Sequence, residues 1–250
     1  MKAAVYLFTN YRTVIILAVL FIVLVLAMPL TKPWFAAWFP ELAQPLYERE
    51  RFFALTIAHI QLVAASSVIA VLIGVGLGIA VTRHSGQEFE PLVATGSAIG
   101  QTFPPAAVLA IAVPIVGFGF WPALVALTLY GLLPIIENTI RGLKSIDADI
   151  LASADGMGMT AWQRLWQVEL PLARPAVLAG IRVSVMINMG TATIGSTVGA
   201  KSLGTPIIAG LVSHNVAYVI QGAVLVALLA VLVDKVLAEF SSRYVGVNSA

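Results

Sequence analysis

Long apolar runs separated by short polar stretches make up most of this chain. Six runs are long enough, or nearly so, to cross a bilayer as helices. They cover residues 13–28, 55–81, 92–113, 123–136, 175–198 and 218–237. Pro104 and Pro105 interrupt the third run, and Gly131 and Pro134 interrupt the short fourth run. The pattern predicts an all-α membrane protein with about six transmembrane helices.

The longest polar stretch, residues 137–172, divides the fourth run from the fifth. Apolar residues recur within it at near-helical spacing and predict a short helix with one apolar face. These residues are Ile146, Ile150, Leu151, Ala154 and Met157. Gly156 and Gly158 follow, and glycine commonly ends a helix at its C-terminus. The first half of the stretch is therefore one short amphipathic helix.

A second short helix is predicted in the other half of the stretch. Thr160 and Gln163 have the spacing of a capping box, which starts a helix. Pro171 ends it, because the residue before a proline is driven out of the α region. Such a helix pair either lies in the lipid interface or docks into a partner protein. Three acids, Asp147, Asp149 and Asp155, disfavour contact with an anionic lipid surface.

Composition agrees with the membrane reading. Of the 250 residues, 60% are hydrophobic and 10% are charged, and the mean hydropathy is +0.96. The chain has no cysteine, which excludes disulfides and thiolate metal sites. We find no Walker A loop, zinc-binding helix or nucleophile elbow. We therefore expect no catalytic residues and no metal site in this chain, and we expect it not to be an enzyme.

The distribution of basic residues predicts the orientation. We number the spans from the N-terminus and place that terminus in the cytoplasm. The cytoplasmic side then carries Lys2, Arg12, Arg83, Arg141, Lys144, Arg164, Arg174 and Arg243. The outer side carries only Lys32, Arg49, Arg51 and Lys201. This bias places both termini, and independently the stretch 137–172, in the cytoplasm.

The N-terminal part is expected to be an anchor followed by an outer connector. A signal peptide is the alternative for residues 13–28, but the apolar run is long for one and no A-x-A site clearly follows. Aromatic residues in the connector suit an interfacial belt better than a cage for a cation: Trp34, Phe35, Trp38 and Phe39. We divide the chain into residues 1–51, a transmembrane core 52–243 that contains the polar stretch 137–172, and a short cytoplasmic tail 244–250.

Polar residues inside the spans serve either helix packing or a transport path. Candidates for the path are Gln101, beside the proline break, and Thr191, Thr193, Ser196 and Thr197, in a stretch of small residues. His59 is read as a hydrogen-bonded interface histidine, with a proton relay as the alternative. Arg182 is expected to reach the cytoplasmic surface by snorkelling. Asp234 and Lys235 are expected to mark the end of the last span.

The polar stretch also resembles a known motif. Ala154, Gly158, Val168, Leu170 and Pro171 have the spacing of the loop that marks the permeases of ABC importers. The Glu-Ala-Ala that usually opens this motif stands here as Ala152-Ser153-Ala154. In that family the loop forms a pair of coupling helices that seats in a groove of the cytoplasmic ATPase.

About four-fifths of the chain resembles the osmoprotectant branch of these importers, the glycine betaine/choline permeases. The stretches that carry this resemblance are GLGIAVTR, QTFPPAAVLAIAVP, LYGLLPIIENT, ADGMGMTAWQRLWQVELPLARPAVLAGIR and GTATIGSTVGA. A glycine pair in a family turn is replaced here by Lys201-Ser202.

The resemblance implies a type I ABC importer permease fold in the bacterial inner membrane. Its expected partners are two copies of an ATPase that binds ATP and Mg²⁺, a second permease that is identical or related, a periplasmic substrate-binding protein and membrane lipid, with no nucleic acid. This chain itself would bind no cofactor. The residues implied to meet the ATPase are Ala152, Ser153, Ala154, Asp155, Gly156, Met157, Gly158 and Met159, with Leu170 and Pro171 completing the motif.

The function that the resemblance implies is ATP-driven uptake of quaternary ammonium osmoprotectants by alternating access. Two alternatives remain. One is an ABC permease for another small solute, such as an amino acid. The other is an ion-coupled secondary transporter, which would need intramembrane acids or a broken-helix ion site.

Overall fold

A computed structural model describes residues 2–245, with side chains described for 12–93, 95–96, 99–100 and 102–243. The α-helices in this part of the chain are α1 (Lys2–Ala27), α2 (Lys32–Trp38), α3 (Phe52–Thr82), α4 (Glu90–Thr102), α5 (Pro105–Val116), α6 (Phe120–Lys144), α7 (Ala148–Gly156), α8 (Ala161–Arg164), α9 (Leu170–Ile194), α10 (Gly204–Val212) and α11 (Val216–Val245). Short 3-10 turns cover Met28–Thr31, Gln87–Phe89 and Gly195–Val198, and a π turn covers Leu165–Glu169. The all-α prediction is confirmed.

Five continuous helical segments of the described chain are long and apolar enough to cross a membrane: Arg12–Trp38, Phe52–Thr82, Phe120–Lys144, Ala161–Val198 and Val216–Arg243. The third predicted span is divided into α4 and the shorter apolar helix α5. Phe103 and Pro104 are extended between them, and the Tyr130 hydroxyl donates a hydrogen bond to the freed Phe103 carbonyl. The break expected at the two prolines is therefore present.

The fourth span is longer than its sequence predicted. We expected residues 123–136, but α6 runs from Phe120 to Lys144 with Pro134 inside it. A proline removes one helical hydrogen bond, which a helix packed on both sides tolerates better than an isolated one. Most of α6 is buried between α3 and α9.

The predicted end of the second short helix at Pro171 is wrong, and so is the predicted start of the fifth span at Pro175. Helix α8 continues through the π turn into α9, and both prolines lie within the continuous helix. In the π turn the Leu170 N–H bonds to the Leu165 carbonyl, five residues back. This wider turn fits around Pro171, whose nitrogen has no hydrogen to donate.

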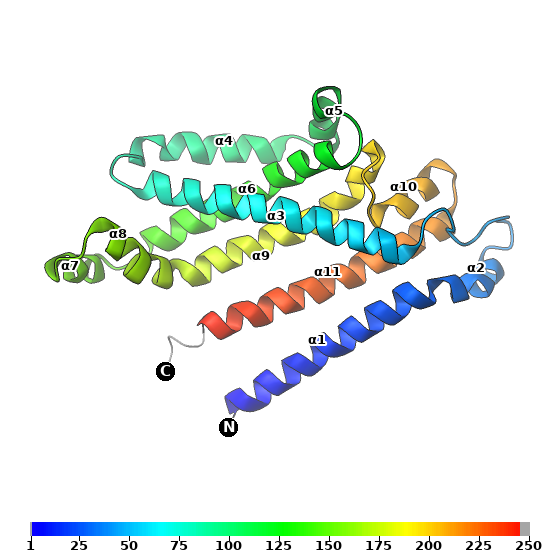
Figure 1. Cartoon of the computed structure of the whole chain (residues 1–250), viewed down its shortest axis with the longest axis horizontal. Helices are drawn as coiled ribbons and strands as arrows, with labels where there is room; N and C mark the ends of the chain where they lie inside the picture. The colour runs from blue at the N-terminus through cyan, green and yellow to red at the C-terminus, as the bar shows by residue number, and fades with distance from the viewer. Residues whose placement is uncertain (1, 246–250) are drawn as a thin grey trace.

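Helices α3, α6 and α9 pack closely because small residues face their neighbours. A Cβ added at Gly78 would lie 2.7 Å from the Thr139 side chain, and one at Gly180 would lie 2.6 Å from the Pro134 carbonyl oxygen. Small residues let backbones approach in this way within a membrane, where packing replaces the hydrophobic effect as the driving force. These three helices form the centre of the bundle (Figure 1).

Some polar side chains inside the bundle pair with one another, and others are buried without a hydrogen-bond partner. The Asn188 amide of α9 donates to Ser66 and Ser67 of α3 at 3.3 and 3.2 Å. The prediction of a hydrogen-bonded His59 is wrong, because its ring is fully buried and neither ring nitrogen has a hydrogen-bond partner. Whether Arg182 reaches the cytoplasmic surface by snorkelling stays a prediction, and its partly exposed guanidinium forms a two-point ion pair with Asp234 of α11 at 2.6 and 2.7 Å. Opposite charges so near the membrane are better paired than separated.

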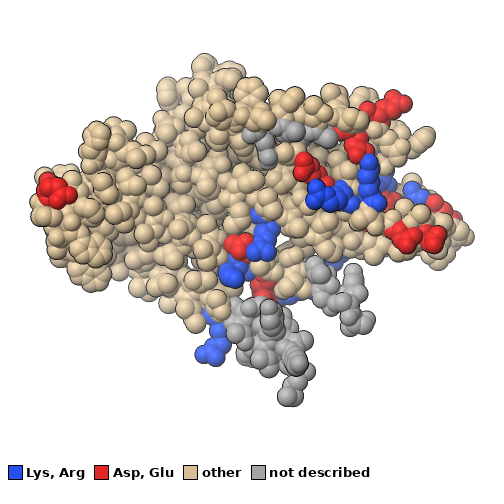
Figure 2. All heavy atoms as spheres, turned by 180° about the vertical axis from the view of Figure 1, so that it is seen from behind, with Lys and Arg blue, Asp and Glu red and all other residues tan. Residues whose placement is uncertain are grey.

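The described ends of α1 and α11 lie at the same end of the bundle as α7 and α8 (Figure 1). In the reverse view of Figure 2, charged atoms gather over this end and most of the remaining face carries none. The opposite end holds α2, α5 and α10. There the connector is fixed to α11 by Gln221, which accepts from the Tyr47 N–H and donates to the Pro45 carbonyl.

The close contact between α6 and α9 predicts that Gly180→Ala destabilises the protein. Its methyl group would meet backbone, which cannot rotate away, and overpacking of this kind costs about 1–3 kcal/mol. Gly190→Ala in the same helix is the matched control, since no atom lies within 4 Å of its added Cβ. Thermal unfolding in detergent should show a lower midpoint for Gly180→Ala alone. Equal midpoints for both variants would contradict the packing described here.

Candidate functional site

The polar stretch forms a compact helical hairpin, α7 and α8, at the charged end of the bundle. Asp147 caps α7 by accepting the Asp149 N–H at 2.9 Å. Gly158 then turns the chain with φ +77°, a left-handed conformation that favours glycine. The predicted stop at Gly156 and Gly158 is confirmed, and Gly158 is the residue on which the turn depends.

Helix α8 starts at the predicted capping box. The Gln163 N–H bonds to the Thr160 hydroxyl at 3.2 Å, and the Thr160 N–H bonds to the Gln163 side chain at 2.8 Å. The two bonds satisfy donors that a helix start leaves free. Since α8 runs into α9, the hairpin is joined directly to a membrane-spanning helix.

One side of the hairpin packs inward and the other is open. Ala154 is 1% exposed, whereas Met157 is 70% exposed at the end of α7. Trp162 and Trp166 are also exposed and meet edge to face, with ring centroids 5.5 Å apart. Of the other predicted contact residues, Met159, Leu170 and Pro171 are half-buried, and Ala152, Ser153, Asp155, Gly156 and Gly158 are exposed. The open side thus offers apolar surface beside acidic groups.

Four charged side chains connect the hairpin to the bundle. Glu169 accepts from Arg83 at 3.1 and 2.5 Å and from Arg164 at 2.9 Å. Arg164 also donates to both carboxylate oxygens of Asp155 at 2.6 Å. Sequence reasoning missed this cluster, because Arg83 and Glu169 lie 86 positions apart and no short-range pattern joins them.

The predicted path residues do not share one surface. Thr191 is buried, whereas Thr193 and Thr197 bond to backbone carbonyls of their own helical turns. Ser196 turns toward the following loop, where it meets Ser202 at 2.9 Å and the Ala200 carbonyl at 3.0 Å. The Gln101 side chain lies outside the described residues. The assignment of these residues to a transport path stays a prediction.

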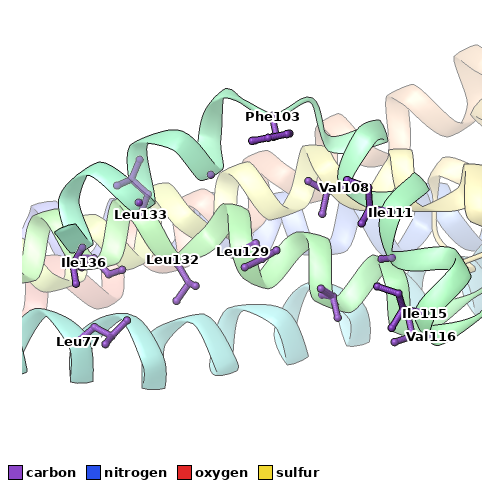
Figure 3. A pocket seen from close by; sticks show the side chains of 15 residues that line it. Leu77, Phe103, Val108, Ile111, Ile115, Val116, Leu129, Leu132, Leu133 and Ile136 are labelled. Carbon is purple, nitrogen blue, oxygen red and sulfur yellow. The ribbon is translucent and has the colours of Figure 1, made fainter.

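A groove of about 730 Å³ lies among α3, α4, α5 and α6, and the sequence did not reveal it. Its lining is apolar, and Leu77, Phe103, Ile111 and Leu129 are among its residues (Figure 3). None of the four described path candidates lines it. Among the described residues there is also no group of three or more histidines or acids placed to hold a metal ion.

Comparison with known proteins relates this arrangement to transport. Residues 70–245 match the family model described as the binding-protein-dependent transport system inner membrane component. The osmoprotectant import permease protein OsmY of Salmonella typhimurium is 44% identical over 74% of this chain and 78% of its own length. The glycine betaine/carnitine/choline transport system permease protein OpuCB of Bacillus subtilis is 40% identical over 72% of this chain and 82% of its own.

The fold has solved counterparts. An inward-facing structure of the MetNI methionine ABC transporter matches 79% of this chain and 99% of its own with a TM-score of 0.68, at 22% identity. At this identity the likeness concerns the fold, which is that of a type I ABC importer permease. The family match covers most of the described chain, including the α7–α8 hairpin. The chain belongs to the family of inner membrane components of binding-protein-dependent transport systems.

Proposed function

We propose that this chain is the permease subunit of an ABC importer for quaternary ammonium osmoprotectants. With a second permease it would form the translocation path, while a separate ATPase hydrolyses ATP. The observation that carries the proposal is the α7–α8 hairpin, which lies at one end of the bundle (Figure 1) and includes the exposed Met157. Family membership supports a transport subunit without an enzyme site of its own.

The open side of the hairpin suits a protein partner better than lipid. Asp147 and Asp149 are exposed, and carboxylates are repelled by anionic lipid headgroups. Methionine is flexible and polarisable, so it adapts to a groove in a partner. The contact surface we assign to the ATPase is therefore residues 152–159, with Met157 at its tip.

The direct connection between hairpin and membrane helix supports a mechanism of alternating access. The helix is continuous from α8 into α9, so a movement of α8 is not absorbed by a flexible loop before it reaches α9. Alternating access requires contacts that differ between an inward-facing and an outward-facing state. The hairpin, placed between the ATPase and the bundle, is where this chain would make them.

The substrate class is proposed from the relatives. Three of them are named for glycine betaine, choline or osmoprotectant transport. We assign the first recognition of substrate to a periplasmic binding protein, as the family description implies. Amino-acid transport, suggested only by the names of more distant fold neighbours, is the second candidate.

Met157→Asp should prevent assembly with the ATPase. The change places a charge where an apolar contact is proposed, and losing one such contact weakens binding by about tenfold or more. Val212→Asp is the control, because Val212 is similarly exposed, at 78%, but lies at the opposite end of the molecule. Copurification of the ATPase from detergent should fail for Met157→Asp only. Normal copurification by both variants would remove Met157 from the interface.

Gly158→Val should abolish uptake while the permease remains inserted in the membrane. Left-handed backbone costs an L-residue about 1–2 kcal/mol, and more for a β-branched one, so the hairpin turn would change its shape. Gly76→Val is the control, since Gly76 is helical, lies outside the assigned ATPase surface and its added Cβ meets nothing within 4 Å. Uptake of radiolabelled substrate, measured at equal expression, should be lost in Gly158→Val and retained in the control. Equal uptake would show that the turn geometry is not needed.

Reconstitution should identify the substrate class. In liposomes with its ATPase and binding protein, the complex should hydrolyse ATP faster when the binding protein is loaded with glycine betaine or choline, because only loaded protein stabilises the state competent for transport. Stimulation by methionine instead would retain the importer and discard the substrate class. Uptake that persists without any ATPase would favour an ion-coupled transporter.

A further inference from the structure

Glu169 lies at the centre of the four-residue ion cluster, between the bundle and the hairpin. Its side chain is 5% exposed, and it accepts from Arg83 on one side and from Arg164 on the other. Asp155 completes the cluster from the outer end of α7. The two acids and two arginines balance in charge, so removing the central carboxylate would leave one positive charge uncompensated.

The cluster joins three elements that are separate in the sequence. Arg83 directly follows α3, Arg164 is the last residue of α8, and Asp155 belongs to α7. Glu169 itself ends the π turn, immediately before α9. A single carboxylate thus connects the hairpin to α3, a helix that packs along both α6 and α9.

Burial makes this connection stiff. Breaking either contact would leave a largely buried carboxylate with one charged partner fewer, and removing one partner of a buried ion pair is costly. Arg83 binds it through two parallel N–H groups, which fixes orientation as well as distance. The cytoplasmic side offers a contrast in Glu90, which pairs with Lys144 in an exposed setting between α4 and α6.

We infer that Glu169 is a positioning residue that transmits movement of the α7–α8 hairpin to the inner end of α3. The inference rests on the proposed function, because the movement is the one that the ATPase would impose. Through α9 alone the hairpin moves the helix to which it is joined. Through Glu169 it also moves α3, so that two of the three central helices respond together.

The test is Glu169→Gln, which keeps shape and removes charge, compared with Glu90→Gln. Both variants are reconstituted in liposomes with the ATPase and the loaded binding protein, and uptake and ATP hydrolysis are measured in the same sample. We expect Glu169→Gln to assemble and hydrolyse ATP, but with about tenfold less substrate moved per ATP, a size typical of coupling between sites. Glu90→Gln should keep the wild-type ratio.

A purely structural role would lower thermal stability and yield while leaving the ratio of uptake to hydrolysis unchanged, and this result would overturn the inference. Arg83→Gln guards against a Glu169→Gln variant that does not fold, because it removes the α3 side of the connection and leaves Glu169 bound to Arg164. It should lower the same ratio, and a wild-type ratio in this variant would also overturn the inference.

A double-mutant cycle with Arg83→Gln and Glu169→Gln gives a further check. If the two residues act as one connection, the double variant should lower the ratio of uptake to ATP hydrolysis no further than either single variant does. If the losses in this ratio from the two single variants add up in the double variant, Arg83 and Glu169 do not act as one connection. Failure of the wild-type chain to couple with any ATPase would instead refute the proposed function, whereas normal coupling in wild type and all variants would refute the role of Glu169 alone.

Discussion

The close approach of α3, α6 and α9 is the contact on which the rest of the structure depends. In a bilayer, apolar side chains gain little by leaving lipid for protein, so helices associate through tight packing and internal polar bonds. Gly78, Gly180 and Gly131 each lie where a methyl group would collide with a neighbouring helix. The Asn188 bonds to Ser66 and Ser67 lie in the same contact. The hairpin, the α4–α5 break and the outer connector are all attached to this centre.

Local chemistry made part of this structure predictable. The capping box at Thr160, the glycine turn at Gly158 and the break before Pro105 each depend on neighbours within a few residues, and each is present as expected. The predictions failed where packing outweighed local preference. Pro134 and Pro171 were read as interruptions, yet both lie within continuous helix, because neighbouring helices and a wider turn compensate for the missing N–H.

The sequence did not predict which charged residues, distant in the chain, would form ion pairs. Arg182 looked like a residue that snorkels, and nothing near it in the chain indicated Asp234, 52 positions away. Glu169 was likewise one acid among several in the polar stretch, and its pairing with Arg83 became apparent only from the position of α3 in the structure. A charge pattern predicts which side of a membrane a loop faces. It does not predict which charges meet, since that depends on how the helices are arranged.

The π turn between α8 and α9 determines how α8 is oriented relative to α9. An α-helix advances by about 100° per residue, and a π turn accommodates one residue more than an α turn does. The side of α8 that faces outward is therefore fixed relative to α9 by the number of residues in Leu165–Glu169. Loss of one residue there would close the wider turn, and the Pro171 ring would then collide with the carbonyl four residues before it and bend the helix at the base of the hairpin. The length of this turn, more than the identity of its residues, determines the direction in which the hairpin extends from α9.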